Sequence, residues 1–463
     1  MSAESPSDSD GWEARPPVKS QGLEIKALQW GGNQGIMAAL YPQGVTILNH
    51  TILKKKMKDN FKMIQISNKA VEVRVRNDSS ANSDFQIIMT LGMNIKGIDC
   101  CGNHTLFWNG KFAQLYDVQG SKGPQLLGNF ESHSNVCALT PESVVQQNEN
   151  RIEVCSYSGE VKQSLPMTDQ EGDILKIDAR GKFMAIVTTQ SLIKMFDISR
   201  RTYKQIGVTR KFEIKSGESL GEIKEIALNS DGKKLCILAD QVPFPTIRIP
   251  DTKFYIYDID MDNFMQFQVS KNRVPIEAFW DQQDPRLLAV ETEFVRTSSD
   301  AGKNELDATH QEGELKPTIE GIKDNEMEAD FKKKKDDDWQ GKTVETFFVT
   351  TDYSVKRQDV IKFEDGEETL LGLQVPYFYF MGRKVNEEDE EENETQQMTT
   401  QQNSEPRSSN MIILRKPMKD FVGLENVEEA IKKAILNFSH FLTVGNMDEA
   451  YNSVRNIKNN TVW

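Results

Sequence analysis

Histidine, the side chain that most often carries enzyme chemistry, is rare in this chain, and its few copies fall into no recognisable catalytic pattern. The histidines are His50, His104, His133, His310 and His440. None of them belongs to the H-E-x-x-H motif of zinc enzymes, and no Walker A loop or G-x-G-x-x-G turn is present to hold a nucleotide phosphate. Carboxylates are plentiful, but a paired acid–base site depends on a geometry that sequence does not reveal. We therefore predict a protein that is not an enzyme, with no catalytic residue, no cofactor and no metal.

The cysteines also lack the spacing of a chemical site. They are Cys100, Cys101, Cys137, Cys155 and Cys236. No two of them form a C-x-x-C pair, so the ligand spacing of a zinc site is missing. An odd, scattered set of this kind suits buried free thiols in a reducing compartment.

Charge and hydropathy narrow the class of partner. The 463 residues carry a formal net charge of -14, with a pI near 5.1, which argues against broad binding to nucleic-acid phosphates or anionic lipid. No apolar run approaches the roughly 18 residues that a membrane span needs. The first residues, MSAESPSDSDGWEARPP, lack the basic and apolar regions of a secretory signal. We expect a soluble, intracellular protein that works through other proteins.

The elements that would position any site are mainly β-strands. Residues 1–20 are rich in Ser, Pro and Asp and are predicted to be a disordered N-terminus. From 21 to 385, short runs of Val, Ile, Phe and Tyr alternate with turn residues. Three runs end in an aromatic residue and Asp, at Asp117, Asp197 and Asp258, with intervals of 80 and 61 residues. Repeats of about 40 residues with this ending predict a mainly β fold, a WD40-type β-propeller of about seven blades, with an incomplete propeller left open. A pair of β-sandwiches is the alternative.

Two charged tracts interrupt the strand pattern. Residues 297–342 are highly charged and nearly free of aromatic residues, so we predict a disordered insertion within the propeller. Its basic run at 332–335 is followed at once by three Asp, and a solvated loop is the simpler interpretation. Residues 386–410 are acidic and then Gln-rich, which predicts an extended linker.

The last segment, 418–463, has helical periodicity. The apolar stripe of the first helix consists of Val427, Ala430, Ile431, Ala434, Ile435, Phe438, Phe441 and Leu442. Gly445 is suited to end this helix, and Asn446 followed by Glu449 fits the start of a second one. Two helices with a short turn form the unit of tetratricopeptide-like (TPR-like) solenoids, so we predict the start of such a solenoid. The residues expected to pack between repeats or against a partner are Phe421, Leu424, Phe438, Phe441, Leu442, Tyr451 and Trp463.

A single hairpin does not make a stable solenoid, because repeats bury their apolar faces on one another. Either further repeats are missing after Trp463, or the hairpin docks on the propeller or on another chain.

Several segments resemble one known family. The most diagnostic are DFVGLE (420–425), NFSHFLTVGNMDEAY (437–451) and the final Val462-Trp463, with further matches such as WNGKFAQLYDV (108–118) and LLGLQVPYFYF (370–380). Together they are similar to the junction between the second propeller and the solenoid in the 140-kilodalton subunit of intraflagellar transport complex A. The resemblance spans about 100 to 463, whereas residues 1–84 add little.

This resemblance implies a non-catalytic scaffold that assembles with the other subunits of intraflagellar transport complex A. It further implies retrograde transport in cilia and entry of membrane proteins into cilia. The implied location is the cilium, with its basal body and axoneme, and the cytoplasm. No nucleic acid and no direct membrane span are expected. A vesicle-coat subunit shares the propeller–solenoid order and is the alternative, and a propeller hydrolase with an unrecognised site is a further one.

Overall fold

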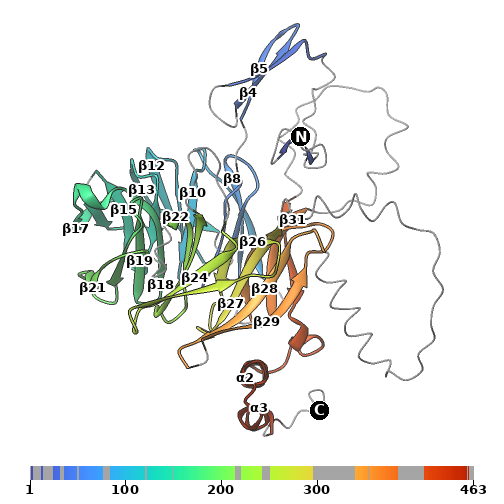
Figure 1. Cartoon of the computed structure of the whole chain (residues 1–463). Helices are drawn as coiled ribbons and strands as arrows, with labels where there is room; N and C mark the ends of the chain where they lie inside the picture. Colours follow the sequence, from blue (N-terminus) through green and yellow to red (C-terminus); the bar gives the residue numbers. More distant parts are fainter. Residues whose placement is uncertain are drawn as a thin grey trace, which may run out of the picture. The chain divides into compact units, whose positions relative to one another are not determined.

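The computed structural model describes residues 24–31, 36–49, 52–76, 84–119, 123–149, 151–213, 220–241, 251–295, 339–352, 354–383, 411–455 and 457, together with the backbone of two short strands, β1 (Ser2–Ala3) and β2 (Trp12–Glu13). The chain divides into two compact units, Met1–Leu53 and Lys54–Trp463 (Figure 1). In the first unit β1 pairs with β2, and the strands β3 (Ala27–Trp30), β4 (Ile36–Tyr41) and β5 (Gly44–Asn49) form an antiparallel meander.

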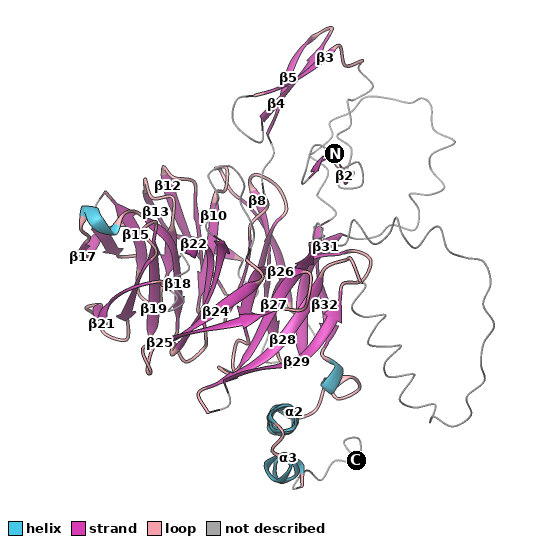
Figure 2. Ribbon diagram, in the orientation of Figure 1, coloured by secondary structure: helices cyan, strands magenta, loops and turns pink. Residues whose placement is uncertain are grey.

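The second unit contains seven antiparallel sheets, which we number as blades one to seven in chain order (Figure 2). Blade one consists of β6 (Lys55–Lys58), β7 (Phe61–Gln65), β8 (Ala70–Val75) and β9 (Phe85–Thr90). Blade two consists of β10 (Gly97–Cys101), β11 (His104–Trp108), β12 (Phe112–Val118) and β13 (Pro124–Glu131). Blade three consists of β14 (Cys137–Leu139), β15 (Val144–Asn148), β16 (Arg151–Cys155) and β17 (Val161–Pro166). Blade four consists of β18 (Ile174–Arg180), β19 (Phe183–Thr188), β20 (Leu192–Asp197) and β21 (Lys204–Lys211). Blade five consists of β22 (Leu220–Leu228), β23 (Lys234–Gln241), β24 (Lys253–Asp258) and β25 (Asn263–Gln268). Blade six consists of β26 (Arg273–Trp280), β27 (Leu287–Phe294), β28 (Thr343–Thr350) and β29 (Ser354–Lys362). Blade seven consists of β30 (Glu367–Gln374), β31 (Tyr377–Arg383) and β32 (Met411–Pro417).

The seven blades close into a ring. Each blade is a meander whose first strand lies beside the first strand of the next blade, and β30 of blade seven lies beside β6 of blade one. Radial packing of this kind lets neighbouring blades cover one another's apolar faces. The fold is therefore a mainly β propeller of seven blades, which confirms the predicted WD40-type class.

The repeated aromatic–Asp endings fall on equivalent strands. They occur at or next to the ends of β12, β20 and β24, which are the third strands of blades two, four and five. The interval of 80 residues thus corresponds to two blades and the interval of 61 to one. At this position an Asp can connect two strands of its blade. The buried carboxylate of Asp258 accepts a hydrogen bond from Lys234 Nζ at 2.8 Å and so links the third strand to the second.

Four of the five cysteines, Cys100, Cys101, Cys137 and Cys236, lie in the cores between the blades. All five are free and buried, which confirms the expected state of the thiols. Burial raises the pKa of Cys101 to about 11 and that of Cys155 to about 11. These thiols are therefore protonated at neutral pH, and a thiol in that state is a poor nucleophile and metal ligand.

Carboxylates on the innermost strands connect neighbouring blades. Asp99 Oδ2 accepts the backbone N–H of Leu139 in the next blade at 2.7 Å, and Asp178 Oδ2 accepts that of Leu228 in the same way at 2.8 Å. Lys56 lies between these two carboxylates and helps to hold the pKa of Asp178 below its usual range, in spite of the opposing effect of burial. Buried charges that satisfy backbone donors of a neighbouring blade fix the relative placement of the blades.

Blade seven differs from the other six. It has three strands among the described residues, and the other blades have four each. Residues 384–410, between β31 and β32, lie outside the described residues, so the predicted linker 386–410 joins two strands of one blade. The predicted insertion 297–342 likewise falls between β27 and β28, mostly at positions outside the described residues.

The first blade begins later than the sequence pattern indicated. The sequence predicted a propeller from residue 21, whereas the compact unit with the seven blades begins at Lys54 and the strands before it form two separate sheets. Alternating apolar residues mark β3–β5 as strands but do not say to which unit a strand belongs. Most of residues 1–20, predicted to be disordered, lie outside the described residues.

Candidate interaction surface

The C-terminal helices are joined to the propeller by a short connection that is anchored by two buried side chains. A 3-10 turn, η5 (Lys419–Phe421), follows β32 directly, and α2 (Glu429–Val444) and α3 (Met447–Val454) come after it. Phe421 is fully buried in the core that blades six and seven share, together with Met418. Ile435 and Leu436 of α2 belong to the same core. The helical hairpin therefore packs on blades six and seven, which is one of the alternatives that the sequence left open.

Polar contacts fix α2 on blade six. Gln358 Nε2 in β29 donates to Asp420 Oδ2 and to Ser439 Oγ, both at 2.8 Å, and the Ser439 hydroxyl donates to the same carboxylate oxygen at 2.6 Å. Arg286 Nη2, beside β27, donates to Asn437 Oδ1 at 2.8 Å. Because these bonds join η5, α2 and the propeller in one network, they set the orientation of the helix as well as its position.

The helix ends follow the predicted chemistry. Gly445 adopts the left-handed conformation with φ 80° and ends α2, and Asn446 Oδ1 accepts the backbone N–H of Glu449 at 3.2 Å at the start of α3. Only a residue without a β-carbon adopts that φ at no steric cost. Both local predictions are confirmed, and α3 packs against α2 across this two-residue turn.

The residues predicted to pack between repeats or against a partner have three different environments. Phe421 is buried; Leu424, Phe438 and Phe441 are half-buried; Leu442 and Tyr451 are exposed. Trp463 lies outside the described residues. The large apolar side chains that are exposed in the segment from η5 to α3 are Val422, Leu442, Met447 and Tyr451. The hairpin thus buries one side on the propeller and leaves apolar side chains in contact with solvent, where a protein partner can bind.

The buried face of α2 is displaced from the predicted stripe. The buried residues are Ile435, Leu436, Ser439 and His440, which share one helix face, whereas Ala430 of the predicted stripe is exposed. Leu436, Ser439 and His440 were missed because a stripe of apolar residues does not show which side of the helix meets the propeller. The polar network on Ser439 and the ring contacts of His440 make this face suitable for burial.

His440 connects α2 with blade six. Its ring is 3 % exposed and makes an edge contact with Phe348 of β28, with ring centroids 5.0 Å apart. Burial, and then the positive charge of Arg286, hold the pKa of His440 below its usual value of 6.5, while Asp284 opposes this shift. Docked His440 therefore favours the neutral ring.

We expect acidification to weaken the docking of α2. The pKa is lower in the folded state, so this contribution to stability is complete above about pH 6.5 and is lost as the pH falls below it. Hydrogen exchange of the α2 amides measured from pH 7.5 to 5.5, corrected for intrinsic rates, should show a loss of protection. His440→Phe should remove most of this pH dependence, and His133→Gln, at an exposed position, should leave it unchanged. Equal pH dependence in all three proteins would contradict the assignment to His440.

The histidines and the possible metal ligands are the remaining candidates for chemistry. Among the described residues, no group of three or more His, Cys, Asp or Glu side chains is placed to hold a metal ion. His50 and His310 lie outside those residues. His104 makes an edge contact with Tyr157, with ring centroids 5.0 Å apart, as expected for a loop or blade residue.

One pattern in the chain matches that of serine hydrolases. Residues 217–221 read Gly-Glu-Ser-Leu-Gly, which fits G-x-S-x-G. The chemistry of that motif needs the serine on a sharp turn between a strand and a following helix. Here Leu220 begins strand β22, and Ser219 lies outside the described residues. The pattern therefore precedes a strand, which is not the context that the motif requires.

No helix among the described residues has both the length and the hydropathy needed to span a bilayer.

Comparisons with known proteins identify the propeller. Residues 59–274 and 268–383 match the family described as the IFT140 second β-propeller. Among solved structures, Hsv2 from Kluyveromyces marxianus is similar at 10 % identity, with a TM-score of 0.38 and coverage of 74 % of this chain and 99 % of that chain. The Cps50 (Swd1) β-propeller domain from Myceliophteria thermophila is similar at 10 % identity, with a TM-score of 0.38 and coverage of 57 % and 93 %. Likeness of this degree to solved structures carries no information about function.

Proposed function

Because this chain belongs to the family of the IFT140 second β-propeller, we propose that it is a non-catalytic scaffold subunit of intraflagellar transport complex A. In this role it supports retrograde transport in cilia and the entry of membrane proteins into cilia. The observation that carries the proposal is the family match, which runs from residue 59, just after β6, to the end of β31 and so includes part or all of every blade.

The structure of the second unit supports a scaffold role. A propeller whose last blade and first helical hairpin share one buried core presents blade surfaces and helix surfaces in a fixed relation. Assembly of several subunits requires such a fixed relation, because each interface must form without disturbing the next. The partners in this proposal are the other subunits of complex A, and the location is the cilium, with its basal body and axoneme, and the cytoplasm.

The test is where the tagged chain is located in ciliated cells and which proteins co-purify with it. We expect signal along the cilium and at its base, and co-purification of other complex A subunits identified by mass spectrometry. An unrelated seven-bladed propeller with the same tag, expressed at the same level, should show neither. A diffuse cytosolic signal without these subunits would contradict the proposal, and co-purification of vesicle-coat subunits in their place would favour the alternative function.

A further inference from the structure

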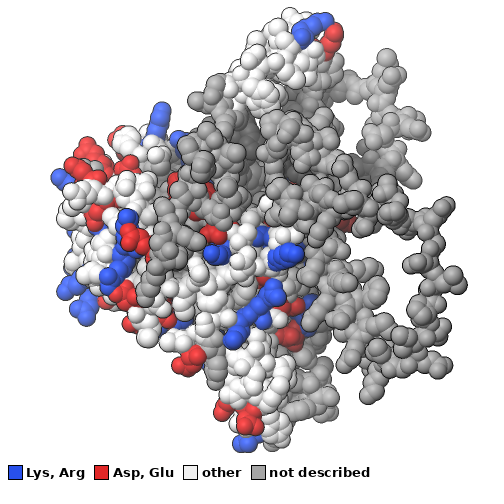
Figure 3. Space-filling view, in the orientation of Figure 1, with Lys and Arg blue, Asp and Glu red and all other residues white. Residues whose placement is uncertain are grey.

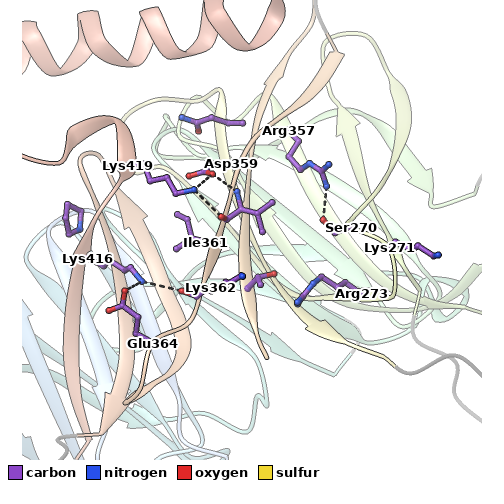
Figure 4. Close-up of a pocket in the computed structure, with 14 residues that line it drawn as sticks. Ser270, Lys271, Arg273, Arg357, Asp359, Ile361, Lys362, Glu364, Lys416 and Lys419 are labelled. Carbon is purple, nitrogen blue, oxygen red and sulfur yellow. Dashed lines mark hydrogen bonds and ion pairs between the residues drawn. The ribbon is translucent and has the colours of Figure 1, made fainter. Parts of the chain in front are cut away.

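A groove of about 830 Å³ runs along the outer strand of blade six. Residues 357–362 of β29 form its floor, the connection from β25 to β26 forms one side, and the end of β32 with η5 forms the other (Figure 4). The groove lies on the outer strand and borders the hairpin, because its lining includes Lys419 of η5 and Gln358, which donates to Ser439 of α2. Because six consecutive residues of an extended strand span about 17 Å, the groove is much longer than a single phosphate or carboxylate.

The lining of this groove is mainly basic. Its Lys and Arg residues are Lys271, Arg273, Arg357, Lys362, Lys416 and Lys419. The acidic residues among the described lining are Asp359 and Glu364. In a chain with a net charge of -14, this excess of positive charge is a local reversal of sign. Figure 3 shows Lys and Arg side chains gathered over the region of β26–β29.

The two sides of the groove differ in how far their charges are neutralised. On the side of β32 and η5, Lys416 Nζ is 2.6 Å from Glu364 Oε1, and Lys419 Nζ is 2.6 Å from Asp359 Oδ1. On the side of β25 and β26, Lys271 and Arg273 make no ion pair with any residue that the structure describes. Lys271 is exposed, whereas Arg273 is buried and donates to the carbonyl oxygens of residues 339 and 341.

A buried carboxylate pairs with one cation on the Ser270 side. Glu345 Oε2 is 3.5 Å from Arg357 Nη1, and Glu345 also accepts the backbone N–H of Ser270 at 2.9 Å. Among the described residues, Lys271 on this side is exposed and has no acidic partner. The positive charge that can meet a ligand is therefore greatest on the Ser270 side.

The floor of the groove is closed to strand pairing. Lys419 Nζ donates to the Val360 carbonyl at 3.5 Å, and Lys416 Nζ donates to the Lys362 carbonyl at 3.3 Å. The Val360 N–H donates to Asp359 Oδ1 at 2.8 Å. Side chains that occupy the free edge of an outer strand prevent another strand from adding to it. A ligand in this groove must therefore be recognised by its charge and not by backbone pairing.

We propose that this groove binds an extended, acidic segment of a partner protein. The length of the groove suits about five or six extended residues, and Lys271 with Arg357 on one side suits the Asp and Glu side chains on one face of such a segment. The chain's own acidic tract, 386–395, follows Arg383, which pairs with Met411, whereas the groove lies beside Pro417 at the other end of β32. The 27 residues between Arg383 and Met411 are long enough to span β32, so the experiment separates this tract from a partner segment.

The test uses a fluorescent peptide with the sequence NEEDEEENET as the acidic probe and the same peptide with every Glu and Asp replaced by Gln or Asn as the neutral probe. We expect the full chain to bind the acidic probe in a fluorescence anisotropy titration, with affinity that falls as salt is raised, and not to bind the neutral probe. Lys271→Glu combined with Lys362→Glu should weaken binding at least about tenfold. Lys111→Glu combined with Lys204→Glu makes the same change of charge on exposed positions of other blades and should alter binding less than about twofold.

Equal weakening by the two double variants would overturn the proposal, because the probe would then sense only the total charge. Absence of binding to the full chain would also overturn it. If binding appears only after deletion of residues 386–395, the occupant is the chain's own tract and the partner is excluded. None of these measurements involves cilia, so a chain that binds the probe but stays out of cilia would refute the proposed function and leave this inference standing.

Discussion

Replacing Phe421 with Ala is expected to lower the free energy of unfolding by about 3–5 kcal/mol, the usual cost of removing a fully buried aromatic ring. Phe421 is 0 % exposed and lies in the core that blade six, blade seven and α2 share. The cavity that Ala leaves would remove contacts on all three elements at once. Urea denaturation followed by tryptophan fluorescence should show a lower midpoint, and hydrogen exchange should show faster exchange of the α2 amides.

Val422→Ala is the matched control, because Val422 is the next residue and 65 % exposed. Its effect should stay within about 0.5 kcal/mol, as for most surface substitutions. If Phe421→Ala cost less than about 1 kcal/mol, or if it left the exchange of α2 unchanged, the shared core would not be what holds the hairpin on the propeller.

The placement of Phe421 explains how a single hairpin can be stable here. A helical repeat normally buries its apolar face on a neighbouring repeat. In this chain the inner face of α2 is buried on blades six and seven, so the propeller takes the place of a preceding repeat. The side chains of Leu442, Met447 and Tyr451 are exposed and remain available for contact with a further helix or a protein partner.

Local signals in the sequence predicted the fold class and the helix ends correctly. Strand endings at Asp117, Asp197 and Asp258 gave the blade period, and Gly445 and Asn446 marked the turn between the helices. These features are decided by backbone conformation and by residues close in the chain. Their physical causes, a left-handed φ and a capping hydrogen bond, act within a few residues.

Features that depend on distant residues could not be predicted in the same way. The buried face of α2 is set by Gln358 and Phe348, which lie some 80 to 90 positions earlier in the chain. Met411–Pro417 was assigned to no blade, because 27 residues separate it from β31 and nothing in the sequence indicates that the two strands pair. The basic groove was missed because its cations come from three separate segments and are diluted by the acidic composition of the whole chain.

Closure of the ring depends on a charged network at the seam between blades seven and one. Lys55 of β6 forms an ion pair with Glu277 of blade six and donates to the Leu370 carbonyl of β30 at 2.5 Å. Glu291 Oε2 accepts the Thr369 hydroxyl at 2.8 Å and the Leu370 N–H at 2.7 Å. Both ends of the ring thus meet blade six through these side chains, at the place where the last blade has three described strands.

Lys55→Met is therefore expected to destabilise the propeller by about 2–3 kcal/mol, less than for a fully buried pair, because it removes one partner of an ion pair whose side chains are 10 % and 32 % exposed and keeps the apolar stem. Burial already raises the pKa of Glu277, and loss of the lysine would raise it further and leave the Leu370 carbonyl without this donor. The measurement is the urea midpoint, together with hydrogen exchange of β6 and β30, which should lose protection before the other innermost strands. Glu277→Gln in the same chain should recover part of the loss, because the pair is coupled.

Lys233→Met provides the control, since Lys233 forms an ion pair of 2.7 Å with Asp260 in which both side chains are more than half exposed. An exposed pair contributes about 0–1 kcal/mol, so this variant should change the midpoint little and leave β6 and β30 protected. If the two lysine variants behaved alike, the seam would be held by the apolar contacts of β6 and β30 alone. A larger effect of Lys55→Met that is confined to the seam strands would instead show that ionic contacts close the ring, and that the seam is where this propeller opens first.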